Sequence, residues 1–189
     1  MAQSPPLTGA KCRLEPFAAR HLGERYVGWL SSPEVVRYSE QRHRRHDLAS
    51  CESYAASFEG SPHFFWAIIA NDEALGHIGN INAYVDATNR VADVGIMVGE
   101  RAAWGRGYGT DAWLAACRYL LLDLNLRKVT AGTLANNLGM LSVMKRAGMR
   151  EEGRRRRQSL WENTEVDVVE AGLLHEEFVA FLKAGFKQG

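Results

Sequence analysis

Val91–Ala112, with the sequence VADVGIMVGERAAWGRGYGTDA, joins an alternating apolar segment to a glycine-rich turn and the start of a helix. Val94, Ile96 and Val98 share one face of a strand with a period of two residues, and Asp93 lies on the other face. Past the turn, apolar residues recur at helical spacing, at Trp113, Leu114, Cys117, Leu120, Leu121 and Leu124. The stretch therefore predicts a strand, a tight turn and an amphipathic helix in direct succession.

The turn in this stretch is predicted to bind an anion. Gly105, Gly107 and Gly109 remove side chains where the helix begins. At such a position unpaired backbone N–H groups converge and the helix dipole favours negative charge, so a phosphate group can approach closely. Arg101 and Arg106 lie in or beside the turn and add positive charge.

Two nucleotide-binding motifs fit this turn poorly. The P-loop requires Gly-Lys-Ser/Thr after the loop, and no lysine stands there. The dinucleotide pattern G-x-G-x-x-A is formally present as Gly107, Gly109 and Ala112. That fold, however, places an acidic residue at the end of the next strand, roughly 20 residues on. The next expected strand, Lys128–Leu134, ends in Ala-Asn-Asn without a carboxylate, so the sequence disfavours both motifs.

The segment Trp104–Ala112 resembles the acetyl-CoA diphosphate loop of the GNAT N-acetyltransferases. That loop reads Arg/Gln-x-x-Gly-x-Gly/Ala, with Trp104 here in the Arg/Gln position. The Trp-Gly-Arg-Gly-Tyr-Gly-Thr form is typical of the branch that contains the ribosomal-protein N-terminal acetyltransferases and related small-molecule enzymes, including amino-sugar acetyltransferases. Downstream, Asn137 and the run Arg146-Ala-Gly-Met149 are similar to the Asn…Lys-x-Gly-Phe segment of that branch.

The fold class expected from the patterns and from this resemblance is mixed α+β. Strands are predicted at Leu7–Leu14, Phe64–Ala70, Leu75–Tyr84, Val91–Val98, Lys128–Leu134, Met149–Arg157 and Glu165–Leu174, and helices at Ala18–Leu30, from the N-cap Asp47 to Phe58, from Trp113 to Leu124, and at Leu138–Ala147. The resemblance implies a twisted, mostly antiparallel sheet that is splayed between its fourth and fifth strands, with helices on both faces. One GNAT-type domain is expected over residues 1–189.

The resemblance implies acetyl-CoA as cosubstrate, and the six scattered histidines form no metal-binding pair, so no metal is expected. By analogy, the pantetheine arm pairs with a bared strand edge and the diphosphate binds at the glycine turn. The expected cofactor-binding residues are Ile96, Met97, Val98, Trp104, Gly105, Arg106, Gly107, Tyr108, Gly109, Thr110 and Asn137. For Asn137 the alternative is an ordinary helix N-cap, because Asn is common where a strand turns into a helix.

The implied reaction is direct attack of a neutral amine on the thioester, so a base must remove a proton. The candidates for the base are Asp93, Glu100, His77 and Glu40. Asp93 is preferred because it precedes the presumed pantetheine contacts on the same strand. The alternative is an aspartate that pairs with an arginine or caps a bulge at Gly95.

The general acid is less well marked in the sequence. Members of the family carry a Tyr or a Ser in the helix after the asparagine, and this chain has Met144 and Met140 at those positions. Ser142 is nearby but out of register, and it is the remaining catalytic candidate. Because a thiolate leaves readily without help, the mechanism does not depend on a dedicated acid.

The acceptor-binding residues are expected to be Tyr38, Glu40, Arg42 and His77. The alternative for the basic run Gln41–His46 is a solvated connector. The second basic run, Arg154–Arg157, either lines an anionic acceptor or is a solvated strand, with alternate arginines on opposite faces. Three functions stay open: acetylation of a small amine, preferably a nucleotide-linked amino sugar; acetylation of a protein N-terminus; and non-catalytic acyl-CoA binding.

Composition restricts the other partners. A net charge of +1 and only one strongly basic cluster argue against nucleic acid, and no apolar run is long enough for a membrane span. The three cysteines are scattered, which indicates a reducing cytoplasm and no disulfide framework or zinc site. A small-molecule amine or a protein N-terminus is the expected partner, and the resemblance is compatible with a homodimer.

Overall fold

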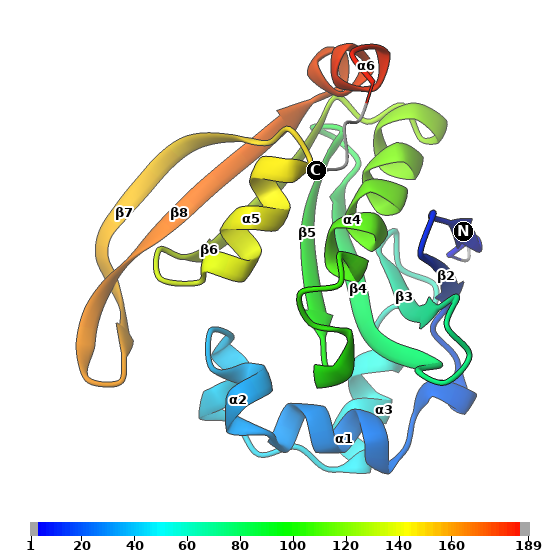
Figure 1. Cartoon of the computed structure of the whole chain (residues 1–189), viewed down its shortest axis with the longest axis vertical. Helices are drawn as coiled ribbons and strands as arrows, with labels where there is room; N and C mark the ends of the chain where they lie inside the picture. Colours follow the sequence, from blue (N-terminus) through cyan, green and yellow to red (C-terminus); the bar gives the residue numbers. More distant parts are fainter. Residues whose placement is uncertain (1–3, 186–189) are drawn as a thin grey trace.

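A computed structural model describes residues 4–185 of the chain (Figure 1). Eight strands form one sheet: β1 (Leu7–Thr8), β2 (Cys12–Pro16), β3 (Phe64–Ala70), β4 (His77–Asp86), β5 (Val91–Val98), β6 (Lys128–Leu134), β7 (Arg150–Trp161) and β8 (Thr164–Leu174). The α-helices are α1 (Glu24–Ser31), α2 (Pro33–Val36), α3 (Leu48–Ala56), α4 (Tyr108–Arg118), α5 (Leu138–Arg146) and α6 (His175–Lys183). None of these helices is long and apolar enough to cross a lipid bilayer.

The order of the strands in the sheet is β1-β2-β3-β4-β5-β6-β8-β7. All neighbours are antiparallel except β5 and β6, which run parallel. Their pairing is short: it starts at Val91 with Lys128 and ends at Asp93 with Thr130. Beyond that point β6 continues along β8 as far as Leu134, while the rest of β5 has no partner on this side. The predicted mixed sheet and its splay are therefore confirmed.

The N-terminal elements are more broken than the sequence predicts. The expected strand Leu7–Leu14 is two strands, because a turn closed by a hydrogen bond from Gly9 N to Cys12 O (2.8 Å) separates them. The splay therefore lies between the fifth and sixth strands rather than between the fourth and fifth. The expected helix Ala18–Leu30 is likewise divided into a 3₁₀ turn at Ala19–His21 and α1.

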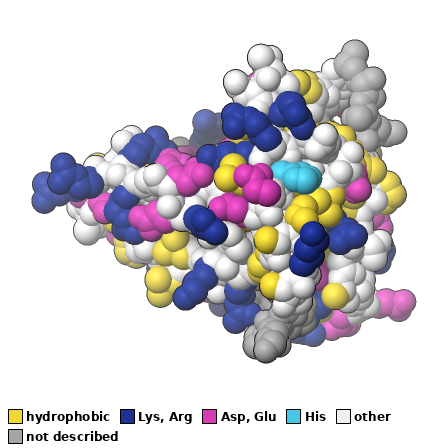
Figure 2. All heavy atoms as spheres, turned by 90° about the horizontal axis from the view of Figure 1, so that it is seen from above, with side chains coloured by type: hydrophobic (Ala, Val, Ile, Leu, Met, Phe, Trp, Pro, Cys, Tyr) yellow, Lys and Arg dark blue, Asp and Glu magenta, His cyan; other side chains and the backbone are white. Residues whose placement is uncertain are grey.

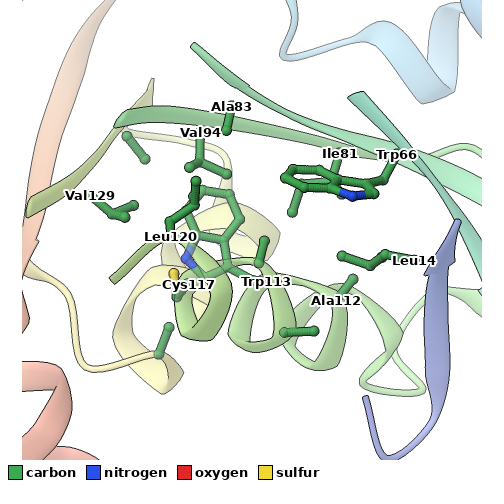
Figure 3. Packing of buried hydrophobic residues seen from close by; sticks show 14 of the residues in the cluster. Leu14, Trp66, Ile81, Ala83, Val94, Ala112, Trp113, Cys117, Leu120 and Val129 are labelled. Carbon is green, nitrogen blue, oxygen red and sulfur yellow. The ribbon is translucent and has the colours of Figure 1, made fainter. Parts of the chain in front are cut away.

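The two faces of the sheet carry separate hydrophobic clusters. Alternation along β3 directs Trp66 and Ile68 into the larger cluster, which α4, α5 and α6 cover, and Phe65 into the smaller one with residues of α1 and α3. Figure 3 shows Trp66 of the sheet and Trp113 of α4 within the larger cluster. Helices thus lie on both faces, as expected, and α4 is the helix that follows the glycine turn.

Candidate functional site

The free edge of β5 lies in the gap where β5 and β6 diverge (Figure 1). Gly99 N donates to Ile78 O of β4 (2.9 Å), so Gly99 faces β4. Because alternate residues present their N–H and C=O groups to opposite neighbours, Met97 also faces β4, and Ile96 and Val98 face the gap. The carbonyl of Val98 accepts a hydrogen bond from Trp104 Nε1 (2.7 Å). Trp104 is therefore anchored at the end of this edge and occupies the Val98 carbonyl, whereas beyond Asp93 no strand pairs with the gap-facing side of β5 within the described residues.

The glycine turn, residues Gly105–Gly109, lies between this edge and α4 and is called the bend below. Gly105 and Gly107 have φ angles of +70° and +85°, in the left-handed region that favours glycine. Gly107 caps α4, and the first amides of any α-helix have no partner within the helix. A Cβ on Gly109 would lie 3.6 Å from Val98 and 3.7 Å from Val143 of α5. The bend, the end of β5 and α5 therefore lie together around one site.

We expect Gly107→Ala to lower the free energy of unfolding by about 1 kcal/mol, because an L-residue in the left-handed region costs about that much. Gly28→Ala is the matched control. Gly28 lies in α1, and nothing is within 4 Å of a Cβ built there, so this change is expected to raise stability by about 0.5–1 kcal/mol. Urea denaturation followed by circular dichroism measures both. Equal effects of the two substitutions would contradict the role of the bend.

The two arginines predicted to add charge to the bend are each paired with a carboxylate. Arg101 lies 3.0 Å from Glu34, and Arg106 lies 3.1 Å from Asp72. The Arg106 guanidinium also stacks over the Tyr108 ring, 5.4 Å from its centroid. Both cations are therefore already largely compensated, and the backbone of the bend remains the main anion-binding feature among the residues predicted for this site.

Asn137 is the N-cap of α5. Its side-chain oxygen accepts a hydrogen bond from Met140 N (3.2 Å), and its Nδ2 donates to Thr133 Oγ1 (3.0 Å). Asn137 is thus the helix N-cap that the sequence analysis gave as the alternative, and its contact with the cofactor stays a prediction. On the same helix Met144 is buried in the core, and Ser142 is exposed. A catalytic role of Ser142 also stays a prediction.

Asp93 lies at the point where β5 and β6 begin to part. Thr130 Oγ1 of β6 donates a hydrogen bond to Asp93 Oδ1 (2.9 Å), and Tyr84 is its register partner on β4. The pKa of Asp93 is raised above its usual range, chiefly by desolvation and further by the Glu170 carboxylate, while the Thr130 hydrogen bond acts in the opposite direction. No arginine pairs with Asp93 among residues 4–185. We call the point where β5 and β6 part, at Asp93 and Thr130, the fork. A carboxylate with a raised pKa at this point suits a general base.

Two other carboxylates considered as bases are engaged elsewhere. Arg25 Nη2 donates to Glu100 Oε2 (2.7 Å), and this hydrogen bond lowers the pKa of Glu100. Glu40 is exposed and forms an ion pair with Arg42 (3.1 Å). The lowered pKa makes Glu100 a weaker base, and the Glu40 carboxylate is engaged by Arg42.

His77 lies in an aromatic cluster on β4, next to α1. Its Nε2 contacts Gly79 O (3.0 Å) and Asn80 Oδ1 (2.9 Å), and its ring packs against His21 and Trp29. Burial lowers the pKa of His77, so the imidazole is neutral at pH 7. With Nε2 donating to both oxygens, the other ring nitrogen carries the lone pair.

A bridge of aromatic rings joins the segment after α2 to the tip of the β7–β8 hairpin. Tyr38 stacks on Trp161 with ring centroids 5.8 Å apart, and the Arg37 guanidinium lies over both rings. Trp161 Nε1 donates to Arg37 O (3.0 Å), and Arg42 Nη2 donates to Leu160 O (3.1 Å). Tyr38 and Arg42, both predicted to bind the acceptor, therefore form part of a wall rather than a free connector.

The arginine run of β7 is interspersed with acidic side chains. Arg154 pairs with Glu151, Arg155 with Glu170, and Arg157 with Glu165. Figure 2 shows both signs mixed along the arm that β7 and β8 form on the left. The simple alternation predicted for Arg154–Arg157 is wrong, because the register shifts between Arg155 and Ser159 and Arg157 has a φ of +52°.

Comparison with known proteins assigns the family. The model of the "Acetyltransferase (GNAT) domain" matches residues 11–150. This chain belongs to the GNAT acetyltransferase family. An N-acetyltransferase 9-like protein of Nematostella vectensis is 25% identical over 75% of this chain and 76% of its own length. The human alpha/beta-tubulin-N-acetyltransferase 9 is 26% identical over 68% of this chain and 67% of its own.

Solved structures show the same fold. The spermidine N-acetyltransferase of Vibrio cholerae, crystallised with CoA and spermine, superposes with a TM-score of 0.78. The match covers 90% of this chain and 99% of that one at 15% sequence identity. The fold and the family together identify this protein as an acyltransferase that transfers acetyl groups to amines.

Several residues around the acetyltransferase site carry no motif that sequence reasoning could use. Thr130 and Glu170 adjoin Asp93 only through the strand order, which places β6 and β8 next to β5. Lys11 and Asp111 meet at the bend from distant parts of the chain. For Asp111 a weak signal existed, since an acidic residue in the first turn of a helix is common.

Proposed function

We propose that this acetyltransferase transfers the acetyl group of acetyl-CoA to a small primary amine. The observation that carries the proposal is the unpaired edge of β5, which leads directly to the glycine bend. Extended amides such as those of pantetheine can pair with such an edge as an added strand would. The bend with its free amides then takes the diphosphate, and a free N–H near the fork polarises the thioester carbonyl.

In the proposed reaction Asp93 accepts the proton of the attacking amine. An amine is mostly protonated at neutral pH, and only its neutral form has the lone pair that attacks the carbonyl carbon. The new C–N bond forms as the C–S bond breaks, CoA leaves as the thiolate, and the amine proton passes to Asp93 directly or through water. The raised pKa of Asp93 brings its basicity closer to neutral pH.

Charge on the acceptor side supports an amine without phosphate groups. Asp93 adjoins the fork without an arginine partner among residues 4–185, so it attracts a cationic acceptor, whereas the neighbouring Glu170 is paired with Arg155. Most of the arginine run is paired with carboxylates, so it offers little to an anionic acceptor such as a nucleotide-linked amino sugar. A polyamine or another small cationic amine therefore fits this face better than the nucleotide-linked sugar does.

A protein N-terminus is the second candidate acceptor. The name of the human relative, an alpha/beta-tubulin N-acetyltransferase, favours it. The bridge between Tyr38 and Trp161 argues for the smaller acceptor, because it joins the two walls that a peptide has to pass between.

Release of free CoA from acetyl-CoA across an acceptor panel tests the proposal. The panel contains spermidine, a nucleotide-linked amino sugar, a neutral amino sugar, and peptides that begin with Ser, Ala or Met. We expect turnover with the small amines to exceed that with the peptides. Preference for the peptides would establish the second candidate, and CoA binding without turnover of any amine would indicate a non-catalytic module.

A further inference from the structure

The turn between β1 and β2 is fastened to the first turn of α4 by one buried carboxylate. Asp111 is only 7% exposed, and its oxygens accept hydrogen bonds from three consecutive amides. The donors are Ala10 N (2.9 Å), Lys11 N (2.8 Å) and Cys12 N (3.0 Å). A Cβ on Gly9 would lie 2.2 Å from Asp111 Oδ2, so only glycine permits this close approach. The position of the turn is therefore fixed relative to the bend.

This attachment places the Lys11 ammonium over the bend. Lys11 Nζ donates to Arg106 O (3.0 Å) and lies 3.3 Å from the position that a Cβ on Gly107 would take. An ammonium has three donors, so this hydrogen bond leaves two of them unused by Arg106. Within the described residues 4–185 no carboxylate forms an ion pair with Lys11, in contrast to Arg101 and Arg106.

Asp111 does not form an ion pair with the Lys11 ammonium, although the backbone of Lys11 binds it. Its carboxylate is occupied by the three amides and by the thiol of Cys12, whose Sγ lies 3.3 Å away. The Lys11 ammonium instead reaches across the bend to the Arg106 carbonyl. The turn thus contributes a cation beside Gly107, the N-cap residue of α4.

We propose that Lys11 binds the diphosphate of acetyl-CoA and that Asp111 is a positioning residue, which holds the β1–β2 turn where Lys11 reaches the bend. The inference rests on the proposed function. It adds to the glycine turn a cation, the Lys11 ammonium, which comes from the β1–β2 turn. The diphosphate is preferred over the 3′-phosphate because Lys11 lies over Gly107, at the centre of the bend. Lys11 is exposed and can exchange its contact with Arg106 O for a phosphate oxygen.

Calorimetric titration of Lys11→Gln with CoA, 3′-dephospho-CoA and pantetheine tests the contact. We expect the affinity for CoA and for 3′-dephospho-CoA to fall about tenfold, the loss typical of one charge-assisted hydrogen bond, and the affinity for pantetheine to stay unchanged. Lys11→Arg should keep the affinity for CoA within about threefold of wild type, because the positive charge remains.

The matched control is Arg13→Gln, which removes one positive charge from the same strand region but away from the bend. Arg13 pairs with Glu15, and its loss should leave CoA affinity unchanged. Unaltered affinity of Lys11→Gln would overturn the proposal, and so would a loss seen with CoA but absent with 3′-dephospho-CoA. Failure of the wild-type protein to bind CoA would overturn the proposed function instead.

A double-mutant cycle tests the positioning role of Asp111. Asp111→Asn puts an NH₂ group or a single oxygen where two oxygens now accept three amides, so the turn should detach from α4. In this background Lys11→Gln should change CoA affinity by less than twofold, because Lys11 no longer reaches the bend. Full additivity of the two losses, in variants whose melting curves show folded protein, would show that Asp111 only stabilises the fold.

Discussion

Asp93→Asn is expected to lower kcat for acetyl transfer by about 10²- to 10⁴-fold, the range typical of a lost general base. The asparagine keeps the size of the side chain and an oxygen that can accept the hydrogen bond from Thr130, so the fork should stay intact. The control is Glu151→Gln, which removes a surface carboxylate that pairs with Arg154. A stopped or continuous assay for free CoA measures kcat for both. Equal activity of Asp93→Asn and wild type would exclude Asp93 as the base.

The pH profile gives an independent check on the same residue. Deprotonation of the amine raises kcat/KM at alkaline pH. Asp93 must also be ionised to accept a proton, so the wild-type profile has a further rise at lower pH, through the raised pKa of Asp93. This rise should disappear in Asp93→Asn. In Glu170→Gln it should move to lower pH, because Glu170 is one cause of the raised pKa.

Asp93→Asn should lower activity but should not lower the free energy of unfolding at pH 7. A carboxyl whose pKa is raised on folding contributes stability that is present below its unfolded pKa and is lost as pH rises through its folded pKa. At neutral pH the ionised Asp93 is therefore a cost to the fold, which the neutral asparagine avoids. Urea denaturation should show Asp93→Asn at least as stable as wild type at pH 7, with the difference closing in acid. Loss of both activity and stability would indicate a structural role.

The sequence predicted the elements that build the gap better than those that enclose it. β5 and β6 have the bounds expected, because apolar alternation and turn residues mark both strands clearly. β7 extends to Trp161, well past the expected end at Arg157. Its residues are exposed, so no hydrophobic pattern marks the strand, and only its pairing with β8 defines it.

The missed helix α6 did have a sequence signal. Phe178, Phe181 and Leu182 fall at helical spacing, and two glutamates follow directly on His175 at its start. The contact of Lys11 with the bend had none, because it joins residues about a hundred positions apart through the docking of a turn. A motif identifies ligand-binding residues that lie within one segment of the sequence. A cation such as Lys11, which reaches the bend from a distant turn, can be identified only from the tertiary structure.

Trp113→Ala is expected to lower the free energy of unfolding by about 3–5 kcal/mol, the usual cost of removing a large buried aromatic side chain. Trp113 is fully buried on α4 and faces the sheet within the cluster that includes Val94 and Leu120 (Figure 3). Domains are stable by only about 5–15 kcal/mol, so this single cavity removes much of the total. The contact matters for function as well, since α4 carries the bend at its N-terminus.

Trp113→Phe separates the packing of the ring from its polar atom. Within the described residues Trp113 Nε1 is buried without a hydrogen-bond partner, so phenylalanine removes volume but also an unsatisfied donor. We expect it to cost clearly less than alanine in urea denaturation. Saturating CoA, at about 100 times its Kd, should add about 2.7 kcal/mol to each folded variant, because the ligand binds only the native state. If Trp113→Ala is as stable as Trp113→Phe, α4 is held by contacts other than Trp113. If CoA stabilises Trp113→Phe but not Trp113→Ala, the packing of this ring also sets the geometry of the bend.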